Sequence, residues 1–554
     1  MARIVLTADA TQMSEYWGIP LLPFFSCAPA EKVPRIVFDF LSPQVKHNNG
    51  VAQMAPYGLR KLEASILRTY KPEEVVVAHP DHVSKFVNED TRIIGISTMD
   101  PLGLGPVSMM FTDGGQLTAY TKRKFLELVY EVNRARKRFP KAKLVLGGSG
   151  AWQMETKDEQ TRALGVNHTV IGECDHVIQD IYNDIEFNGA PEFIHVPRGP
   201  KLEQIPDIVG ASTHGLVEVM RGCGRNCQFC EPNLRTAKYY PADKIEREIA
   251  VNRKIGNPNV WIHSEDIFLY KLEDKNGFMP NHEAVVDLFK TVMTQGGITY
   301  ANPTHGTTAP AAADPELIKE ISDTVRAKDD KYIGIQSGLE TGSTELIRKY
   351  MPLKVKPFSP SEWQEVIYNG TRIFNENYWF PAYTLIVGLP GETTDDAIET
   401  VRLIDRMEHG LRKEIGNRAH FTVTPLSFVP LGVLKNKSFF NIDEAIDEAR
   451  FWVIYRSWRH TVLELHSMPP TLMKLNPAFK AIFTTLCWFG SKKILDSIKA
   501  WGRSLGYDGW KPTPSKILGC RSPALAHSNQ NGAHLSRSFT HSLWFRKSAV
   551  GSRR

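Results

Sequence analysis

The sequence predicts an α/β protein with two parallel-sheet domains followed by a helical region. Short apolar segments alternate with helical stretches over the first 200 residues, and the alternation resumes near residue 211. This order is typical of parallel strands connected by helices. A chain of 554 residues is also too long for one core. We therefore expect domains at residues 1–200, 211–435 and 436–512, followed by a basic tail at 513–554.

The first domain is expected to be a doubly wound, Rossmann-like parallel sheet. Its strands are expected at residues 3–7, 74–78, 93–97, 143–146 and 168–171, with helices near 58–70 and 122–138. Ligands of such sheets bind beyond the carboxyl ends of the strands. Glycines at those ends allow close approach of a large cofactor, and hydroxyl groups can bond to its polar rim. Three ends carry such residues: Ser97-Thr98-Met99, Gly147-Gly148-Ser149-Gly150 and Gly172-Glu173.

Three cysteines lie within eight residues, in the pattern C-x-x-x-C-x-x-C formed by Cys223, Cys227 and Cys230. Three thiolates in one loop suit an iron–sulfur cluster. A cube held by three protein sulfurs leaves one iron open to a substrate, as a catalytic zinc site keeps an open position. A structural zinc site is the alternative, but it takes four ligands, and His214 and His263 are the isolated candidates for the fourth.

The remaining cysteines, at positions 27, 174, 487 and 520, are scattered. They predict neither a disulfide framework nor a second cluster, and they indicate a reduced, cytoplasmic protein.

The second domain places further polar residues at strand ends. Strands are expected at residues 216–220, 260–263, 332–335 and 383–387. In parallel barrels, ligands sit at the carboxyl ends of the strands. The first of these ends leads into the cysteine loop; the others lead into Glu265 and Asp266, Gln336-Ser337-Gly338-Leu339-Glu340, and Gly388-Leu389-Pro390. For Glu265 and Glu340, the alternative is an ordinary solvated loop carboxylate.

With these motifs, the chain resembles the cobalamin-dependent radical S-adenosylmethionine (SAM) enzymes. The cysteine loop is similar to the cluster loop of that superfamily, in which the open iron chelates SAM. The ordered segments Pro56-Tyr57-Gly58-Leu59, Gly95-Ile96-Ser97-Thr98, Val145-Leu146-Gly147-Gly148 and Val170-Ile171-Gly172-Glu173 resemble a cobalamin-binding domain. The resemblance implies a partial (β/α)6 barrel as the second domain. It implies a [4Fe–4S] cluster, SAM and methylcobalamin as cofactors.

The resemblance also implies residues for each cofactor. Cys223, Cys227 and Cys230 would bind the cluster, and Glu265 and Asp266 are candidate catalytic residues. Cobalamin would contact Tyr57, Ser97, Thr98, Met99, Gly105, Pro106, Gly147, Gly148, Ser149, Gly150, Trp152, Gly172 and Glu173. SAM would contact Phe229, Glu265, Gln336, Ser337, Glu340, Gly388 and Pro390.

One family pattern is missing from the sequence. Many cobalamin domains supply a histidine to cobalt through D-x-H-x-x-G, which does not occur here. His79 and His82 stand in a different setting and are expected on the surface. The resemblance therefore implies a cobalt face without a histidine ligand, for which Tyr16, Trp17 and Trp152 are candidate covering residues.

The implied activity is C-methylation of an unactivated sp3 carbon, in which a 5′-deoxyadenosyl radical removes hydrogen and methylcobalamin supplies the methyl group. The resemblance implies a peptide or protein substrate, with a glutamine of methyl-coenzyme M reductase as the candidate, and an external electron donor of the ferredoxin or flavodoxin type. A radical cyclase or rearrangement enzyme of the same architecture and a non-catalytic cobalamin-binding protein remain alternatives. A methylthiotransferase would need a second cysteine trio near the N-terminus.

Charge and hydropathy limit the partners. The net charge of +6 lies in the tail, because residues 513–554 contain seven Lys and Arg but no Asp or Glu. The near-neutral body predicts no nucleic-acid partner, and the tail is expected to be disordered. No run of 18 apolar residues predicts a transmembrane span. Segment 478–489 is expected to form a core helix, with a peripheral membrane contact as the alternative. The aromatic residues of this region are expected to pack in the core: Phe451, Trp452, Tyr455, Trp458 and Trp488.

Overall fold

The computed structural model describes residues 2–19, 22–467 and 477–507. The predicted basic tail at 513–554 and Cys520 lie outside the described residues. Within the described ranges, none of the helices combines the length and apolar composition needed to cross a bilayer.

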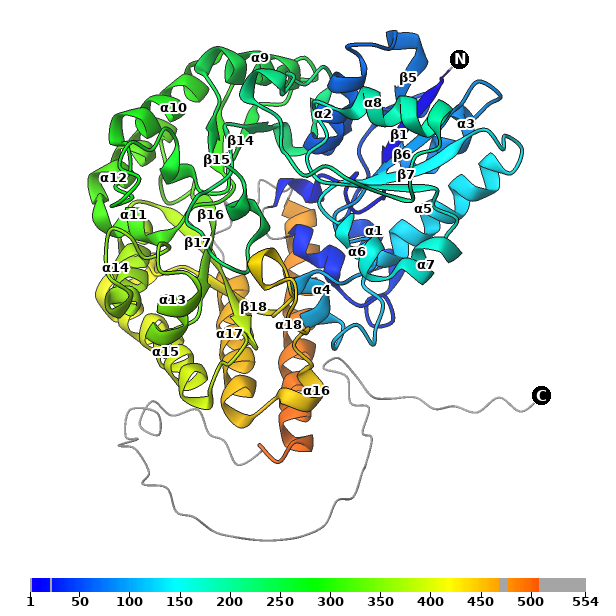
Figure 1. The fold of residues 1–554 in the computed structure, drawn as a ribbon. Helices are drawn as coiled ribbons and strands as arrows, with labels where there is room; N and C mark the ends of the chain where they lie inside the picture. Colours follow the sequence, from blue (N-terminus) through cyan, green and yellow to red (C-terminus); the bar gives the residue numbers. More distant parts are fainter. Residues whose placement is uncertain (1, 20–21, 468–476, 508–554) are drawn as a thin grey trace, which may run out of the picture.

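A six-stranded parallel sheet forms the centre of the first domain, at the right of Figure 1 in blue and cyan. Its order is β5-β1-β6-β7-β8-β9. The strand order reverses between β1 and β6, which is the switch point where doubly wound sheets bind ligands. The predicted parallel sheet is confirmed, and β9 is an edge strand that the sequence did not predict. The strands are β5 (Val75–Val77), β1 (Ile4–Ala8), β6 (Ile93–Ser97), β7 (Lys143–Gly147), β8 (His168–Ile171) and β9 (Phe193–His195).

Helices cover both faces of this sheet. Side chains of a strand alternate between faces, so Ile4 and Leu6 join the core on one side and Val5 the core on the other. The first core includes α2 (Tyr57–Ile66) and α8 (Ile178–Asn183), and the second includes α3 (Val83–Phe86) and α5 (Tyr120–Arg136). The predicted helices at 58–70 and 122–138 correspond to α2 and α5. The domain also contains the short helices α1 (Arg35–Leu41), α6 (Trp152–Thr156) and α7 (Asp158–Ala163).

The second domain contains six parallel strands that follow one another in chain order. Three form the sheet β11-β14-β15, three form the sheet β16-β17-β18, and a parallel bridge between His305 and Gln336 joins the two sheets. Figure 1 shows the helices outside these strands. The strands are β11 (Leu216–Glu218), β14 (Asn259–His263), β15 (Tyr300–Pro303), β16 (Ile333–Glu340), β17 (Trp379–Val387) and β18 (Thr422–Ser427). The main helices are α9 (Ala242–Arg253), α10 (His282–Thr294), α12 (Pro315–Val325), α14 (Trp363–Glu376) and α15 (Thr394–Ile415).

The C-terminal region consists of α16 (Ile442–Ala445), α17 (Glu448–Ser467) and α18 (Pro477–Ser504). Phe451 and Tyr455 of α17 are buried in the core that includes β18, as the packing prediction requires. The prediction of a core helix at 478–489 is wrong for its exposed side chains, since Ile482, Trp488 and Phe489 are about half exposed. The helix buries its other end instead, through Ile498 and Trp501.

The two α/β domains contact each other through a short helix that follows β6. This helix, α4 (Pro106–Phe111), packs against β18, and the ring centroids of Phe111 and Trp458 lie 5.1 Å apart. Gln116 beyond α4 donates a hydrogen bond to Asp443 of α16. The carboxyl end of β6 therefore leads directly into the interface with the barrel.

Candidate iron–sulfur and cofactor site

The cysteine loop follows strand β12 (Met220–Arg221), directly after β11. Cys227 is only 5% exposed, and Cys223 and Cys230 are partly buried. Gly222 has a positive φ of 86°, and a Cβ there would lie 2.8 Å from the Arg235 carbonyl oxygen, so the loop turns where only glycine fits. Burial raises the pKa of Cys227 to about 12 and that of Cys223 above its usual value. A metal that binds these thiols must therefore displace their protons.

A buried arginine within this loop binds it to neighbouring segments. Arg225 donates from Nε to Asp266 Oδ2 at 2.8 Å, and the two side chains are 1% and 0% exposed. Its Nη1 donates to the Leu353 carbonyl at 3.0 Å, and its guanidinium carbon lies 5.2 Å from the centroid of the Phe278 ring. Asp266 also accepts a hydrogen bond from Thr307 Oγ1 at 2.7 Å. Asp266 is closed to substrate, so the structure does not support its predicted catalytic role and places it as a residue that positions the loop.

The residue after Cys227 is held from two sides. The Gln228 backbone N–H donates to the Tyr350 carbonyl at 3.0 Å, at the end of α13 (Thr344–Tyr350). Its carbonyl accepts a hydrogen bond from Val433 N at 2.8 Å, in the 3-10 helix η12 (Gly432–Leu434). Segments more than 100 residues away therefore hold the loop in place.

The donor set fits an iron–sulfur cluster better than zinc. Among the described residues, no three His, Cys, Asp or Glu side chains surround one metal-ion position. Thiolates that hold a cube bind different iron atoms and need not converge on one point. Two histidines are candidates for a fourth zinc ligand. His214 precedes β11 and so lies at the amino end of that strand, away from the cysteines. Burial lowers the pKa of His214 to about 4. His263 lies 3.2 Å by its Nδ1 from Thr304 Oγ1.

Glu340, a predicted SAM contact, lies beside a buried lysine that the sequence analysis missed. Lys354 Nζ is 2.8 Å from Glu340 Oε1, and each side chain is 8% exposed. Burial would lower the pKa of Lys354, but the charges of Glu340 and Cys227 outweigh it and raise the pKa. A fixed positive charge therefore stands near a predicted cluster ligand. Lys354 lies in a loop without a motif, so no local pattern could have found it.

Two neighbours on β16 point in different directions. Ser337 is 3% exposed and its Oγ lies 3.1 Å from Thr308 Oγ1 of α11 (Thr308–Ala313). Its hydroxyl is therefore engaged with the helix layer. Gln336 is partly exposed and lies at the bridge between the two small sheets. Of this pair, Gln336 has the side chain that remains accessible to SAM.

Gly388 and Pro390 line a pocket of about 450 Å³. Gly388 has a φ of 87°, and any Cβ there would overlap the Phe440 ring. The Pro390 carbonyl accepts a hydrogen bond from the Tyr350 hydroxyl. Phe229 does not line this pocket but packs against the core that contains Leu389.

Glu265 is a buried carboxyl group at the end of β14. Its side chain is 14% exposed, and its Oε2 has no hydrogen-bond partner among the described residues. Burial raises the pKa of Glu265. Nearby, the ring centroids of His263 and His305 lie 6.1 Å apart, and burial lowers the pKa of His305 to about 4. A buried carboxyl group with a raised pKa is suited to proton transfer, so Glu265 remains a candidate.

The loops after β6 and β7 interlock through their backbones. Thr98 donates from N and from Oγ1 to the Gly147 carbonyl, at 2.7 and 2.8 Å. Gly148 has a φ of 94°, and a Cβ there would lie 2.8 Å from Thr98 N. The Thr98 hydroxyl therefore uses its proton within the protein, and the side chain is buried. Met99, Gly148 and Ser149 form the exposed edge of the two loops.

Other predicted cobalamin residues also have structural partners. The Asp100 carboxylate accepts hydrogen bonds from Gly105 N at 2.8 Å and from Gln153 Nε2 at 2.6 Å, which sets the start of α4 at Pro106. A Cβ on Gly150 would overlap the Met99 carbonyl. Asp100 and Gln153 were not predicted. Of the aromatic candidates, the Tyr16 hydroxyl donates to the Thr11 carbonyl, Trp17 Nε1 donates to the Phe40 carbonyl, and Trp152 is partly buried at the start of α6.

The expectation of surface histidines is wrong for His79. His79 is 3% exposed, and its Nδ1 accepts a hydrogen bond from Asp81 N at 3.3 Å. Its position directly after the buried end of β5 explains the burial. His82 is partly exposed, and its Nε2 lies 3.1 Å from His47 Nε2.

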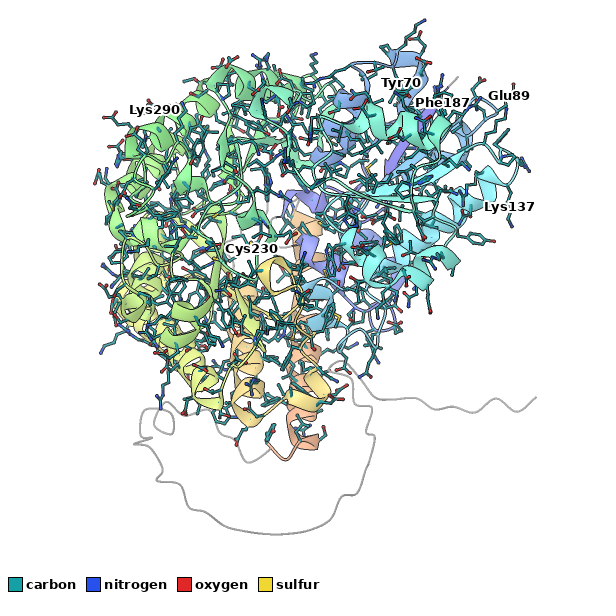
Figure 2. The ribbon with its side chains drawn as sticks, viewed as in Figure 1. Tyr70, Glu89, Lys137, Phe187, Cys230 and Lys290 are labelled. Atoms are coloured by element: carbon teal, nitrogen blue, oxygen red, sulfur yellow. The ribbon has the colours of Figure 1, made fainter. Side chains whose placement is uncertain are left out.

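Tyr57 and Glu173 lie between the two domains. The Tyr57 hydroxyl donates to Glu248 Oε2 of α9 at 2.6 Å, so the structure gives Tyr57 an interdomain partner. After β8, Gly172 is exposed, while Glu173 pairs with Arg235 Nε at 3.0 Å and Asp175 with Arg221 Nη1 at 3.1 Å. Arg221 and Arg235 flank the cysteine loop, so these ion pairs hold the β8 loop of the first sheet against the cluster site. Figure 2 shows Cys230 in the central part of the molecule.

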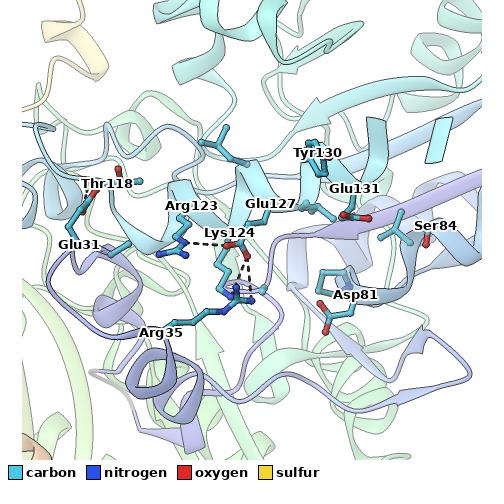
Figure 3. A pocket seen from close by; sticks show the side chains of 16 residues that line it. Glu31, Arg35, Asp81, Ser84, Thr118, Arg123, Lys124, Glu127, Tyr130 and Glu131 are labelled. Atoms are coloured by element: carbon cyan, nitrogen blue, oxygen red, sulfur yellow. Dashed lines mark hydrogen bonds and ion pairs between the residues drawn. The ribbon is translucent and has the colours of Figure 1, made fainter. Parts of the chain in front are cut away.

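A larger pocket of about 910 Å³ lies elsewhere in the first domain, near the carboxyl ends of β1 and β5. None of the predicted site residues lines it. Figure 3 shows Glu127 of this pocket paired with Arg123 and Arg35. The exposed edge formed by Met99, Gly148 and Ser149 therefore remains the candidate cobalamin surface.

Comparisons with known proteins agree with the barrel. The chain is 24% identical over 280 residues to the tRNA-2-methylthio-N(6)-dimethylallyladenosine synthase of Actinobacillus pleuropneumoniae serotype 5b, covering 47% of this chain and 56% of the relative. It is 23% identical over 310 residues to the synthase of the same name from Haemophilus ducreyi, covering 52% of this chain and 62% of the relative. The chain thus spans about half the length of these relatives. Residues 217–404, which begin in β11 and include the cysteine loop, match the family model for the radical SAM superfamily, so the chain contains a radical SAM domain.

Proposed function

We propose that this chain is a cobalamin-dependent radical SAM C-methyltransferase that acts on an unactivated sp3 carbon. The carrying observation is the contact of Glu173 and Asp175, after β8, with the arginines that flank the cysteine loop. Two cofactors that act on one carbon must lie within reach of each other. When bound, the cluster with SAM supplies a carbon-centred radical and cobalamin supplies the methyl group.

Different residues of the chain bind the cofactors and position the cysteine loop. Cys223, Cys227 and Cys230 hold the cluster, and Arg225 keeps their loop in place. Gln336, Gly388, Pro390 and Phe229 border the space for SAM, with the Glu340–Lys354 ion pair close to Cys227. Glu265 holds or accepts a proton at its unpaired carboxyl oxygen. Met99, Gly148, Ser149 and Gly172 line the cobalamin side.

The proposal extends to the substrate class. By the family resemblance, the substrate is a peptide or protein, and the candidate reaction is that of the archaeal glutamine C-methyltransferase of methyl-coenzyme M reductase. A radical cyclase would use the same barrel and differ only in its substrate pocket.

The names of the relatives favour a second candidate, the methylthiolation of a tRNA adenosine. Such an enzyme would need a second cysteine cluster. Outside the triad, the cysteines whose side chains the structure describes are Cys27 and Cys174, and they belong to different cores. Two single cysteines in separate cores do not make a second trio. This pattern favours the methyltransferase.

The by-products of one turnover separate these candidates. The reconstituted protein is incubated with SAM that carries a deuterated methyl group, and with peptides that contain the candidate glutamine. Methyl transfer requires labelled product with S-adenosylhomocysteine and 5′-deoxyadenosine in a ratio near one to one. 5′-Deoxyadenosine alone with an unlabelled product identifies a cyclase. A sulfur-containing product on tRNA identifies a methylthiotransferase and contradicts the proposal.

A further inference from the structure

Four lysines lie in segments that contact the cysteine loop. Lys349 and Lys356 belong to segments whose carbonyls accept hydrogen bonds from Gln228 and Arg225 of the loop. Lys435 and Lys437 directly follow η12, which contacts Gln228. Lys349, Lys435 and Lys437 are exposed and Lys356 is partly exposed. Among the described residues, no ion pair involves any of the four.

Two exposed apolar side chains lie next to these lysines. Val433 of η12 is 57% exposed, and Leu234 of the 3-10 helix η8 (Glu231–Leu234) is 54% exposed. The two short helices touch, because the Glu231 carboxylate accepts a hydrogen bond from Gly432 N at 3.0 Å. We call the four lysines together with Leu234 and Val433 the basic patch. An apolar centre with unpaired charges around it is typical of a transient protein interface.

The loop inside the basic patch is itself open to solvent. Gly224 and Asn226, between the first two cysteines, are exposed, while Cys227 is buried. A partner on the basic patch would therefore approach the cluster ligands closely without removing any described side chain from its core. A cluster that starts SAM cleavage must first gain an electron, and the family resemblance implies an external donor of the ferredoxin or flavodoxin type as its source.

We infer that the basic patch is the docking surface of a small acidic one-electron carrier protein of the ferredoxin type. This inference rests on the cluster part of the proposed function. In the step it serves, the carrier is oxidised by one electron as the cluster is reduced by one electron, and no atom is transferred. The positive charge of the patch complements an acidic carrier, which increases the association rate at low salt.

The test compares charge reversal in the patch with charge reversal elsewhere. The patch variant is Lys356→Glu with Lys435→Glu, and the control is Lys137→Glu with Lys290→Glu. The two control lysines are labelled far from Cys230 at opposite edges of Figure 2. Lys435, Lys137 and Lys290 are exposed and Lys356 is partly exposed, so the folds should be preserved. The probe is an acidic 2[4Fe–4S] ferredoxin, added to the full-length reconstituted protein.

Binding is measured by calorimetry at low and at 0.5 M salt, independently of turnover. We expect the patch variant to bind ferredoxin about tenfold more weakly at low salt, and salt to reduce this difference. SAM cleavage driven by ferredoxin should fall about as much, while cleavage driven by dithionite stays unchanged. The control should match the unmodified protein in all three measurements.

Several outcomes would overturn the inference. Ferredoxin binding by the patch variant that equals binding by the unmodified protein excludes the docking surface. Equally weakened ferredoxin binding by the control variant shows that the effect comes from net charge alone. A fall in dithionite-driven cleavage places the patch in the SAM or substrate site instead. An unmodified protein that binds ferredoxin through the patch but cleaves no SAM with dithionite would contradict the proposed function and leave the docking surface standing.

Discussion

The cysteine loop is held by distant segments through contacts that include the buried Arg225–Asp266 ion pair, whereas the loops after β6 and β7 are held mainly by contacts with each other. Arg225 reaches Asp266, 41 residues away, and the Leu353 carbonyl, 128 residues away. Thr98 donates to the Gly147 carbonyl of the neighbouring strand end, and its own carbonyl accepts a hydrogen bond from Gly150 N. The first site should therefore be sensitive to the loss of a charge, and the second to the addition of a single carbon atom.

The largest effect should come from a cluster ligand. Changing Cys227 to Ala removes one of three thiolates, so iron content should fall to background and SAM cleavage should be lost completely. Iron counting and Mössbauer spectroscopy after anaerobic reconstitution measure this. Cys27→Ala is the control and should retain the cluster, because Cys27 is not one of the three cysteines of the C-x-x-x-C-x-x-C loop. A cluster of normal content in Cys227→Ala would contradict the site.

Removing the anchor of the loop should have the next largest effect. Arg225→Met leaves the Asp266 carboxylate buried without its charge partner, so the free energy of unfolding should fall by about 3–5 kcal/mol. Urea denaturation of the apo protein measures it. The matched control is Arg406→Met in the exposed pair with Glu365, where the side chains are 42% and 57% exposed. That change should cost less than about 1 kcal/mol, and equal losses in both variants would refute the comparison.

The pH dependence of the free energy of unfolding tests the ion pair between Glu218 and Arg221, next to the cysteine loop. Burial would raise the pKa of Glu218, but Arg221 outweighs it and lowers the pKa to about 2, from 4.5 in the unfolded chain. A depressed carboxyl pKa stabilises the fold above the unfolded value, and that stability is lost as the pH falls toward the folded value. The difference in free energy of unfolding between the unmodified protein and Glu218→Gln should therefore be constant above pH 4.5.

Below pH 4.5 that difference should shrink, by about 3 kcal/mol in total by pH 2. Urea titrations at closely spaced pH values, followed by tryptophan fluorescence, measure the difference. Two curves that stay parallel over this range would show that the Glu218–Arg221 contact is not formed in solution.

The smallest effect on stability should come from the backbone-held loops. Gly148→Ala adds a Cβ that would lie 2.8 Å from Thr98 N at a φ of 94°, so stability should fall by about 1–3 kcal/mol. Cobalamin uptake should be lost while the iron content stays normal. Gly58→Ala is the control, since a Cβ there has no neighbour within 4 Å. Cobalamin uptake by Gly148→Ala equal to that of Gly58→Ala would separate these loops from the cobalamin site.

How far the cysteine site and the glycine loops could be predicted from the sequence depends on whether the residues involved are close together in the chain. The cysteine triad is local, since three ligands within eight residues are visible without any fold. The residues that hold the triad are not local: Lys354 and Gln228 meet their partners only after the barrel has formed. The glycine runs were found as patterns, but the structure shows that Gly148 and Gly150 are needed where the two loops touch.

The sequence by itself determined the parallel first sheet and the cluster motif, because period-two and period-3.6 hydrophobic patterns and ligand spacing are short-range properties. Tertiary structure alone decided that Asp266 is a buried partner of Arg225, that Ser337 faces α11 and that Tyr57 bonds to α9. It also decided that segment 478–489 exposes Ile482, Trp488 and Phe489. Burial and pairing depend on contacts between segments far apart in the chain, and these form only when the domains pack together.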